Sequence, residues 1–223
     1  MKLINNEFQI NIELLENTIN VLIIENNDLF SSLVYNLWNQ CEGNEGSWIL
    51  VEDTKQLVIS KNVICIINPF QINLNEKRIT TQLYHEVKLL SDESLLLDES
   101  KLNTQIINFL DRVSSLTPYP ITYASEFNLT NILKIYNFQI DDCCESLLES
   151  IVEYIKLINR ICYINIFVFI GIKQYLNNVE LLYLYEFSLY EKVNLILIEN
   201  HQYEILNFEK LSIIDKDLCI INT

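Results

Sequence analysis

Apolar positions along this chain alternate between strand spacing and helix spacing. Three short runs, 19–24, 163–170 and 194–198, are mostly apolar and predict strands. The run 163–170 is rich in β-branched and aromatic residues, which is typical of a strand buried on both faces, and the run 19–24 suits the middle of a sheet. Helix spacing follows the first run at 29–38 and precedes the second at 147–158, where apolar residues recur every three or four positions. Such amphipathic helices need a sheet to pack against, and the pattern therefore predicts an α/β core.

Shorter β-prone segments and one further helix complete the predicted core. A helix at about 179–191 lies directly before the run 194–198, and strand, helix, strand in this order predicts parallel neighbours with right-handed crossovers. Further strands are predicted at Phe8–Ile12, Trp48–Val51, Gln56–Ile59, Val63–Ile67, Leu211–Ile214 and Leu218–Ile221. The expected sheet is therefore mostly parallel.

Polar residues before the helices predict where the helices begin. Asn27 or Asp28 can cap the first helix, and Asp142 with Glu145 three positions later forms a candidate capping box for the helix that runs to residue 158. The predicted apolar face of the first helix consists of Leu29, Leu33, Leu37 and Trp38.

The middle of the chain has a helical period from Phe70 to about Leu116. Its two sets of helix-spaced apolar residues are separated by cap-forming polar stretches at 91–94 and 98–100, which predicts a helical hairpin. A further short helix at about 129–136 leads back to the α/β pattern.

This change of period divides the chain into two predicted parts. Residues 1–69 and 137–223 form an α/β head with a mostly parallel sheet, and residues 70–136 form an α-helical leg inserted in the head.

Composition limits the protein class. Half of the residues are hydrophobic and only 3 are glycine and 3 proline, so the chain is neither disordered nor a turn-rich all-β protein. The longest apolar runs are too short to cross a bilayer, and the first 30 residues lack a basic flank followed by an apolar block. We therefore expect a soluble, cytoplasmic protein with no membrane partner.

The turn at 25–31 follows the first buried strand and precedes the first helix. A nucleotide-binding α/β protein places its phosphate-binding loop at this point. Here the turn contains no glycine for close backbone approach and no lysine for the phosphates, while Glu25 and Asp28 would repel a triphosphate. We therefore predict that ATP and GTP do not bind.

Catalytic motifs are scarce. Asp53 with Lys55 at a strand end, and Asp215 with Asp217 between two strands, resemble the carboxylate and lysine groups with which nucleases hold a divalent ion. Solvated turn charges are the competing interpretation and the one that we favour. A metal-dependent nuclease is kept as an alternative function.

The formal net charge of −15 argues against a general nucleic-acid binder, because phosphate binding needs clustered lysine and arginine. A local basic surface remains compatible with this charge if folding or assembly gathers the few cations. Lys156 and Arg160 are four residues apart and share a helix face.

The order and spacing of several segments resemble those of the Csn2 proteins of type II-A CRISPR systems, over essentially the whole chain. The similarity begins at Val21–Asn26, followed by Leu29-Phe30-Ser31, and continues through a helical middle. It includes Leu129–Lys134, the helix Leu147–Ile158, Ile166–Phe169, Leu195–Glu199 and Ile213–Asp217.

This resemblance implies a degenerate, P-loop-like head, a helical leg, and a ring-shaped homotetramer. Such rings hold double-stranded DNA, especially at its ends, and take part in spacer acquisition alongside Cas1, Cas2 and Cas9. The implied protein is not an enzyme. A ring also reconciles DNA binding with a charge of −15, because symmetry multiplies each lysine in the lumen fourfold while acidic surface faces outward.

On this basis we predict sequence-independent phosphate contacts. The candidate DNA-binding residues are Lys134, Lys156, Arg160, Lys61, Lys77 and Arg78. A protein scaffold that does not bind DNA is the second alternative, beside the nuclease.

Calcium is the cofactor that the resemblance implies, bound near the junction of leg and head. Calcium takes six to eight oxygen ligands, several of them carboxylates. The corresponding stretch here, 121–127, offers Glu126 as its one carboxylate. Glu126 is therefore the candidate metal ligand, and we expect that calcium does not bind as it does in more acidic relatives.

Overall fold

The computed structural model describes residues 1–222 and divides the chain into two compact units. The sheet unit consists of Met1–Leu74 and Asp142–Thr223, and the helical unit consists of Asn75–Asp141. The bounds predicted from the sequence, 70 and 136, lie a few residues before these junctions.

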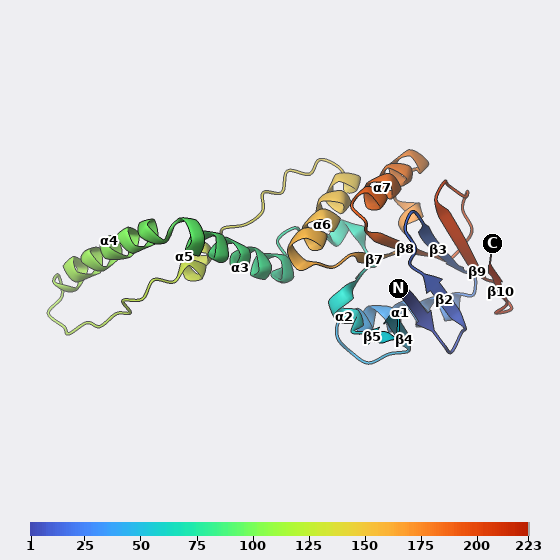
Figure 1. Ribbon diagram of the computed structural model, residues 1–223, viewed down its shortest axis with the longest axis horizontal. Coiled ribbons are helices and arrows are strands. Elements are labelled where there is room, and N and C mark those ends of the chain that lie inside the picture. The colour runs from blue at the N-terminus through green and yellow to red at the C-terminus, as the bar shows by residue number, and fades with distance from the viewer. Residues whose placement is uncertain (223) are drawn as a thin grey trace. The chain divides into compact units, whose positions relative to one another are not determined.

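A six-stranded sheet forms the centre of the sheet unit, in the order β10-β9-β3-β8-β7-β6 (Figure 1). All neighbouring strands are parallel except β9 and β10, which are antiparallel. The strands are β3 (Ile19–Ile24), β6 (Val63–Ile66), β7 (Ile166–Ile170), β8 (Asn194–Glu199), β9 (Glu209–Ile214) and β10 (Ile220–Asn222). The predicted fold class, α/β with a mostly parallel sheet, is confirmed.

A second, antiparallel sheet packs in the same unit, in the order β2-β1-β4-β5. Its strands are β1 (Lys2–Asn5), β2 (Ile10–Glu13), β4 (Trp48–Glu52) and β5 (Lys55–Leu57). The sequence interpretation missed β1, and it extended the strand at 56–59 into residues that form the short helix α2 (Ile59–Asn62).

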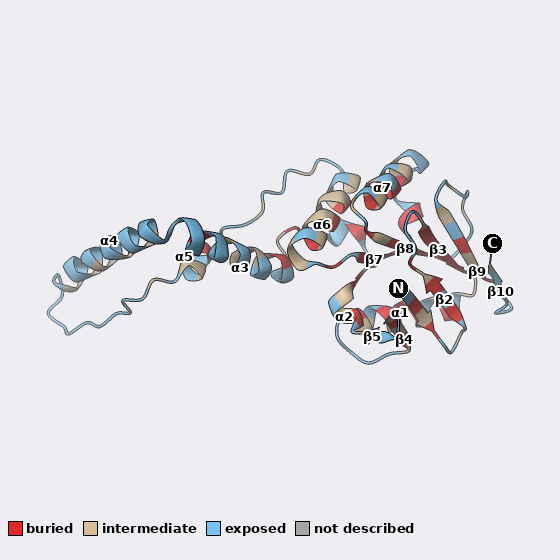
Figure 2. Ribbon diagram, in the orientation of Figure 1, coloured by how far each residue is buried: buried red, intermediate tan, exposed pale blue. Residues whose placement is uncertain are grey.

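Helices cover both faces of the large sheet. Buried side chains of the small sheet and of α1 (Asn27–Cys41) form one core with residues such as Leu22, Val168 and Ile196 of the large sheet. The opposite face is covered by α6 (Leu147–Cys162) and α7 (Asn178–Tyr190), as Figures 1 and 2 show. Two short 3-10 turns, η1 (Pro69–Gln71) and η2 (Ile172–Gln174), follow β6 and β7.

The helix α6 begins later than the sequence predicted. Ser146, not Asp142, is the cap residue, and its hydroxyl accepts a hydrogen bond from the Glu149 amide at 3.2 Å. At the other end, Tyr163 adopts a left-handed conformation with φ of 58°, which ends the helix and delays the next strand to Ile166.

Helix α1 is capped by Asn26, one residue before the predicted caps, and its side chain accepts from the Leu29 amide at 3.0 Å. Leu33 and Leu37 are buried as predicted, whereas Trp38 is 37% exposed. Trp38 lies 100° further round the helix than Leu37, which turns it out of the core.

The helical unit contains α3 (Lys77–Ser94), α4 (Leu96–Ser114) and α5 (Leu129–Ile135). The predicted hairpin of two helices is wrong: only Leu95 separates α3 from α4, and the two helices follow one another end to end (Figure 1). The chain returns along α4 as an irregular segment, 115–128, and then α5 packs against α3.

Few side chains of the helical unit are buried (Figure 2), and α4 has none. The two ends of the helical unit are joined by the Asn75 side chain, which donates to the Ile140 carbonyl at 2.9 Å and accepts from the Ile140 amide at 2.8 Å.

Among residues 1–222, no helix combines the length and the apolar character needed to cross a membrane.

Candidate nucleic-acid interface

The turn between β3 and α1 uses its polar groups to cap the helix. Because the Asn26 side chain already accepts from the Leu29 amide, it occupies the helix end at which a phosphate would bind. Asp28 in the first helical turn adds negative charge there. Both features disfavour a phosphate at this turn, and that ATP does not bind here stays a prediction.

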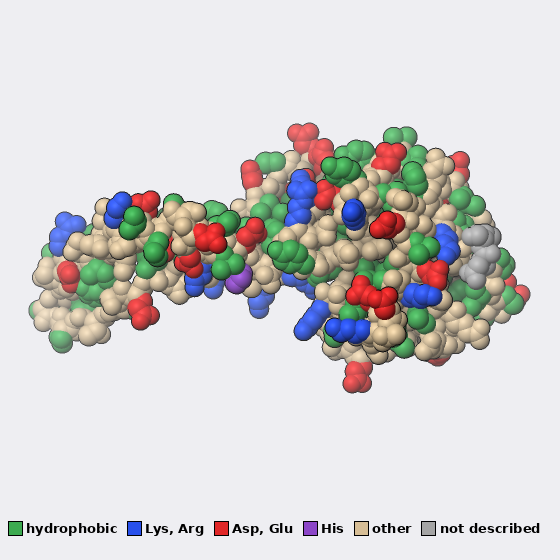
Figure 3. Space-filling model, viewed as in Figure 1, with side chains coloured by type: hydrophobic (Ala, Val, Ile, Leu, Met, Phe, Trp, Pro, Cys, Tyr) green, Lys and Arg blue, Asp and Glu red, His purple; other side chains and the backbone are tan. Residues whose placement is uncertain are grey.

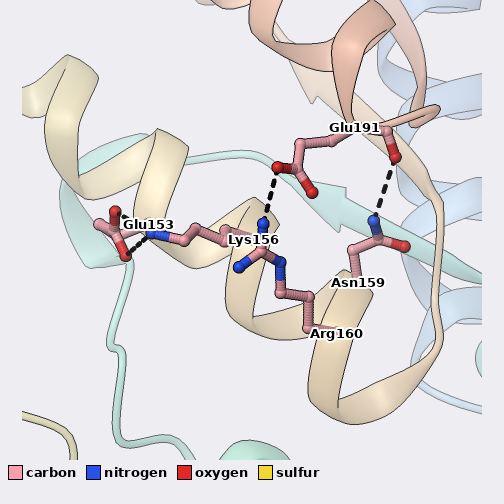
Figure 4. Close-up of polar contacts among 5 residues, drawn as sticks. All are labelled: Glu153, Lys156, Asn159, Arg160 and Glu191. Atoms are coloured by element: carbon pink, nitrogen blue, oxygen red, sulfur yellow. Dashed lines mark hydrogen bonds and ion pairs between the residues drawn. The ribbon is translucent and has the colours of Figure 1, made fainter.

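Lys156 and Arg160 lie one turn apart on α6, as their spacing predicted, but each has a carboxylate partner (Figure 4). The Lys156 ammonium contacts Glu153 at 2.9 and 3.2 Å, and the Arg160 guanidinium contacts Glu191 at 2.8 Å. Asn159 also donates to the Glu191 carbonyl at 3.3 Å. A phosphate would therefore compete with these carboxylates for both cations.

Lys61, the third predicted residue of the sheet unit, lies exposed in the last turn of α2. Within residues 1–222 it forms no ion pair. It is therefore available to an anion at a lower electrostatic cost than Lys156 or Arg160.

Lys77 and Arg78 occupy the first turn of α3 and are exposed. Glu76 stands at the cap position and makes no side-chain capping bond. The helix dipole disfavours cations in a first turn, whereas an anion bound at that end would be favoured by the dipole, the amides and both cations. The two cations therefore favour a phosphate at this helix end, although the Glu76 carboxylate opposes one.

The basic face of α3 extends further than the sequence interpretation proposed. Lys88 lies eleven residues, or three turns, after Lys77, and His85 lies on the adjacent side of the same face; both are exposed. Figure 3 shows basic side chains and a histidine along one edge of α3. The spacing of eleven residues between Lys77 and Lys88 could have indicated this longer face from the sequence. We refer to Lys77, Arg78, His85 and Lys88 as the α3 basic face.

None of the side chains of the α3 basic face forms an ion pair with any residue that the structure describes. Lys134, also exposed, lies in the last turn of α5, where a cation is favoured by the helix dipole. Because α5 packs against α3, the predicted residues Lys77, Arg78 and Lys134 belong to two helices in contact.

Glu126 lies exposed in the irregular segment 115–128. Around it, the Ser125 carbonyl accepts from Asn103 at 3.2 Å, and Asp111 accepts from the Tyr123 hydroxyl, a bond that raises the pKa of Tyr123 above its ordinary value. A stretch 121–127 with one carboxylate does not fit a calcium site of six to eight oxygens, several of them carboxylates. No cluster of three or more metal-binding side chains occurs within residues 1–222.

The residues of the nuclease alternative belong to turns of different sheets. Asp53 adopts a left-handed conformation between β4 and β5. Asp215 follows β9, and its carboxylate accepts from the Asp217 amide at 2.9 Å and the Cys219 amide at 2.8 Å. Asp215 therefore holds the turn before β10, a structural role that accounts for its presence.

Several solved structures resemble the fold at low identity. One is cbiO1 from Clostridium perfringens, part of the ABC transporter complex cbiONQ: it is 12% identical, with a TM-score of 0.48, over 92% of this chain and 76% of the other. MJ1267 in its ADP conformation, an ATP-binding cassette of an ABC transporter, is 12% identical with a TM-score of 0.46, over 95% and 85%. At these values the neighbours assign no nucleotide and no transport role to this chain.

No curated protein sequence matches the chain. A family model does: the one described as CRISPR-associated protein (Cas_Csn2) matches residues 40–218, which span both the sheet unit and the helical unit. The resemblance inferred from the sequence is thereby confirmed, and the chain belongs to the Csn2 family of CRISPR-associated proteins.

Proposed function

We propose that this chain is a non-catalytic protein that binds double-stranded DNA without sequence preference, preferring ends, during the acquisition of CRISPR spacers. The observation that carries the proposal is the α3 basic face, which begins at the first turn of a helix and has no carboxylate partners among the described residues. Phosphates are the ligands that such an arrangement favours, and contacts to phosphates carry no sequence information.

Assembly is the second part of the proposal: four copies form a ring, and Cas1, Cas2 and Cas9 act alongside it. Helix α4 supports self-association because it carries an exposed apolar stripe at helix spacing. The stripe consists of Leu102 (43% exposed), Ile106 (37%), Phe109 (57%) and Val113 (40%). One copy, with a charge of −15, has few basic side chains. A ring of four copies repeats each of them four times around one opening.

The double reversal Lys77→Glu with Arg78→Glu should weaken binding to every duplex sequence tested. The slope of log affinity against log salt should fall by about 1 for each phosphate contact that is lost. Fluorescence anisotropy with two unrelated duplexes between 50 and 200 mM salt, roughly the range over which phosphate contacts are most visible, measures both quantities.

Lys101→Glu is a control with one charge reversal instead of two, chosen because Lys101 already contacts Asp98 at 3.0 Å on an exposed part of α4. It should leave affinity close to that of the wild type. Lys156→Glu with Arg160→Glu should weaken binding less than the Lys77 and Arg78 pair, because both residues are paired with carboxylates before DNA arrives. Unchanged affinity after reversal of Lys77 and Arg78 would remove the α3 basic face from the interface.

Light scattering tests the ring and its preference for ends. We expect the mass of a tetramer in moderate salt, binding to a short blunt-ended linear duplex, and no binding to a closed circular duplex of the same sequence. Since Glu126 does not fit a calcium site, the mass should be unchanged after chelation. A monomer that binds neither DNA would contradict the proposal and favour a scaffold, and cleavage of the duplex with magnesium would favour the nuclease.

A further inference from the structure

A buried group of charged side chains lies between α7 and the large sheet. The Lys173 ammonium, in η2, contacts the Glu209 carboxylate at the start of β9 at 2.6 Å, and the two side chains are 4% and 0% exposed. Tyr185 of α7 donates to the same Glu209 oxygen at 2.7 Å, and the Leu206 amide donates to the other at 3.2 Å. Glu209 is therefore fully paired.

Glu199 is the second carboxylate of this group, and it lies at the end of β8 with 0% exposure. One oxygen accepts from the Lys173 amide at 3.1 Å, while Oε2 has no hydrogen-bond partner among residues 1–222. The group thus holds two carboxylates and one ammonium. Burial, with a further contribution from Glu209, raises the pKa of Glu199 to about 7, although Lys173 opposes the shift.

We propose that Glu199 is a protonation switch that controls how tightly the loop 200–208 closes over this buried group. The loop is held through the same residues: the Lys173 ammonium also donates to the Glu204 carbonyl at 3.4 Å, and the Leu206 amide is bound by Glu209. When Glu199 loses its proton, a second negative charge competes for Lys173, and opening of the loop lets water reach Oε2.

The pKa of Glu199 in the closed and open states determines how opening of the loop depends on pH. Closed Glu199 has a pKa of about 7, and a solvated glutamate has its ordinary value of 4.5, so opening releases a proton between these two pH values. The loop is therefore most firmly closed below pH 4.5. Its opening constant rises by up to about tenfold per pH unit, and about 300-fold in all, and becomes constant above pH 7.

The other groups that face Glu199 come from four elements. They are Lys173 from η2, Tyr185 from α7, Glu209 from β9 and Tyr203 from the loop itself. Burial raises the pKa of Tyr185 and of Tyr203 above the ordinary 10, so both hydroxyls stay protonated in this window. Exposed His201 lies beside Tyr203, with ring centroids 4.2 Å apart, and needs its own control.

Hydrogen exchange of the whole chain between pH 4.5 and 8 tests the proposal. Protection factors, which remove the intrinsic pH dependence of exchange, should fall between pH 4.5 and 7 for amides of 171–175 and 200–208 in the wild type. They should be flat in Glu199→Gln, whose side chain cannot ionise, and should fall as in the wild type in His201→Gln. An equal fall in Glu199→Gln, or a flat wild type, would overturn the proposal.

A second measurement follows the ionisation of Glu199 directly in the wild type. Carbon-13 NMR of glutamate carboxyl groups should show one resonance with a midpoint near pH 7 in the wild type, and Glu199→Gln identifies it by its loss. A Glu199 midpoint near the ordinary 4.5 would overturn the proposal even if exchange in the loop varies with pH.

Discussion

Replacing Lys173 with methionine should destabilise the sheet unit by about 3–5 kcal/mol, which is the usual cost of removing one partner of a buried ion pair. Methionine retains the length and apolar stem of lysine, so the change removes the charge with little change in packing. It leaves the Glu209 carboxylate buried without a counterion, close to Glu199. Urea unfolding followed by circular dichroism measures the loss.

Two further variants show whether the charge is responsible. Lys101→Met removes an ion pair whose members are 73% and 69% exposed, and it should change the free energy of unfolding by less than about 1 kcal/mol. Adding Glu209→Gln to Lys173→Met should restore part of the lost stability, because the uncompensated charge disappears. If Lys173→Met matched the wild type, the ion pair would contribute nothing to the fold.

The burial of this charged group could have been anticipated in part from the sequence. Glu199 directly follows the predicted strand 194–198 and is in phase with Leu195 and Leu197, so continuing that strand by one residue directs its side chain to the same face as those leucines. Its partners were not predictable, because Lys173 follows a different strand and Glu209 begins a third. In the sheet β3 lies between β8 and β9, with Glu199 opposite Ile23 and Glu209 opposite Ile19, and Lys173 contacts both glutamates.

Helix periodicity predicted which residues share one face of a helix. It could not predict which residues of other elements they contact. It correctly placed Lys156 and Arg160 on one face of α6, but Glu191, which binds Arg160, comes from the end of α7. Periodicity also indicated two helices in the middle of the chain, one containing Ile79 to Leu90 and the other Leu102 to Val113. Leu95, the one residue between the two helices, has φ of −122° and ψ of 12°, and no glycine or proline marks a turn there.

Replacing Trp48 with alanine should destabilise the sheet unit by about 3–5 kcal/mol, the range found for the largest buried side chains. Trp48 is 1% exposed and packs in the core shared by α1 and the small sheet, where its indole donates to the Leu33 carbonyl at 3.3 Å. The Gln40 side chain binds the Trp48 backbone at 2.8 and 3.0 Å and would keep β4 in place. The loss would therefore come from the cavity and from the lost indole hydrogen bond, because the Leu33 carbonyl keeps its backbone partner within α1.

The chain supplies its own control for this prediction, since its second tryptophan, Trp38, is 37% exposed on the outer side of α1 beside Tyr35. Trp38→Ala should cost less than about 1 kcal/mol, because surface substitutions leave no cavity. In a Trp38→Phe background the fluorescence of Trp48 alone reports unfolding, and its emission should shift to longer wavelength as the core opens. Equal losses for the two alanine variants would mean that the core between α1 and the small sheet is not packed around Trp48.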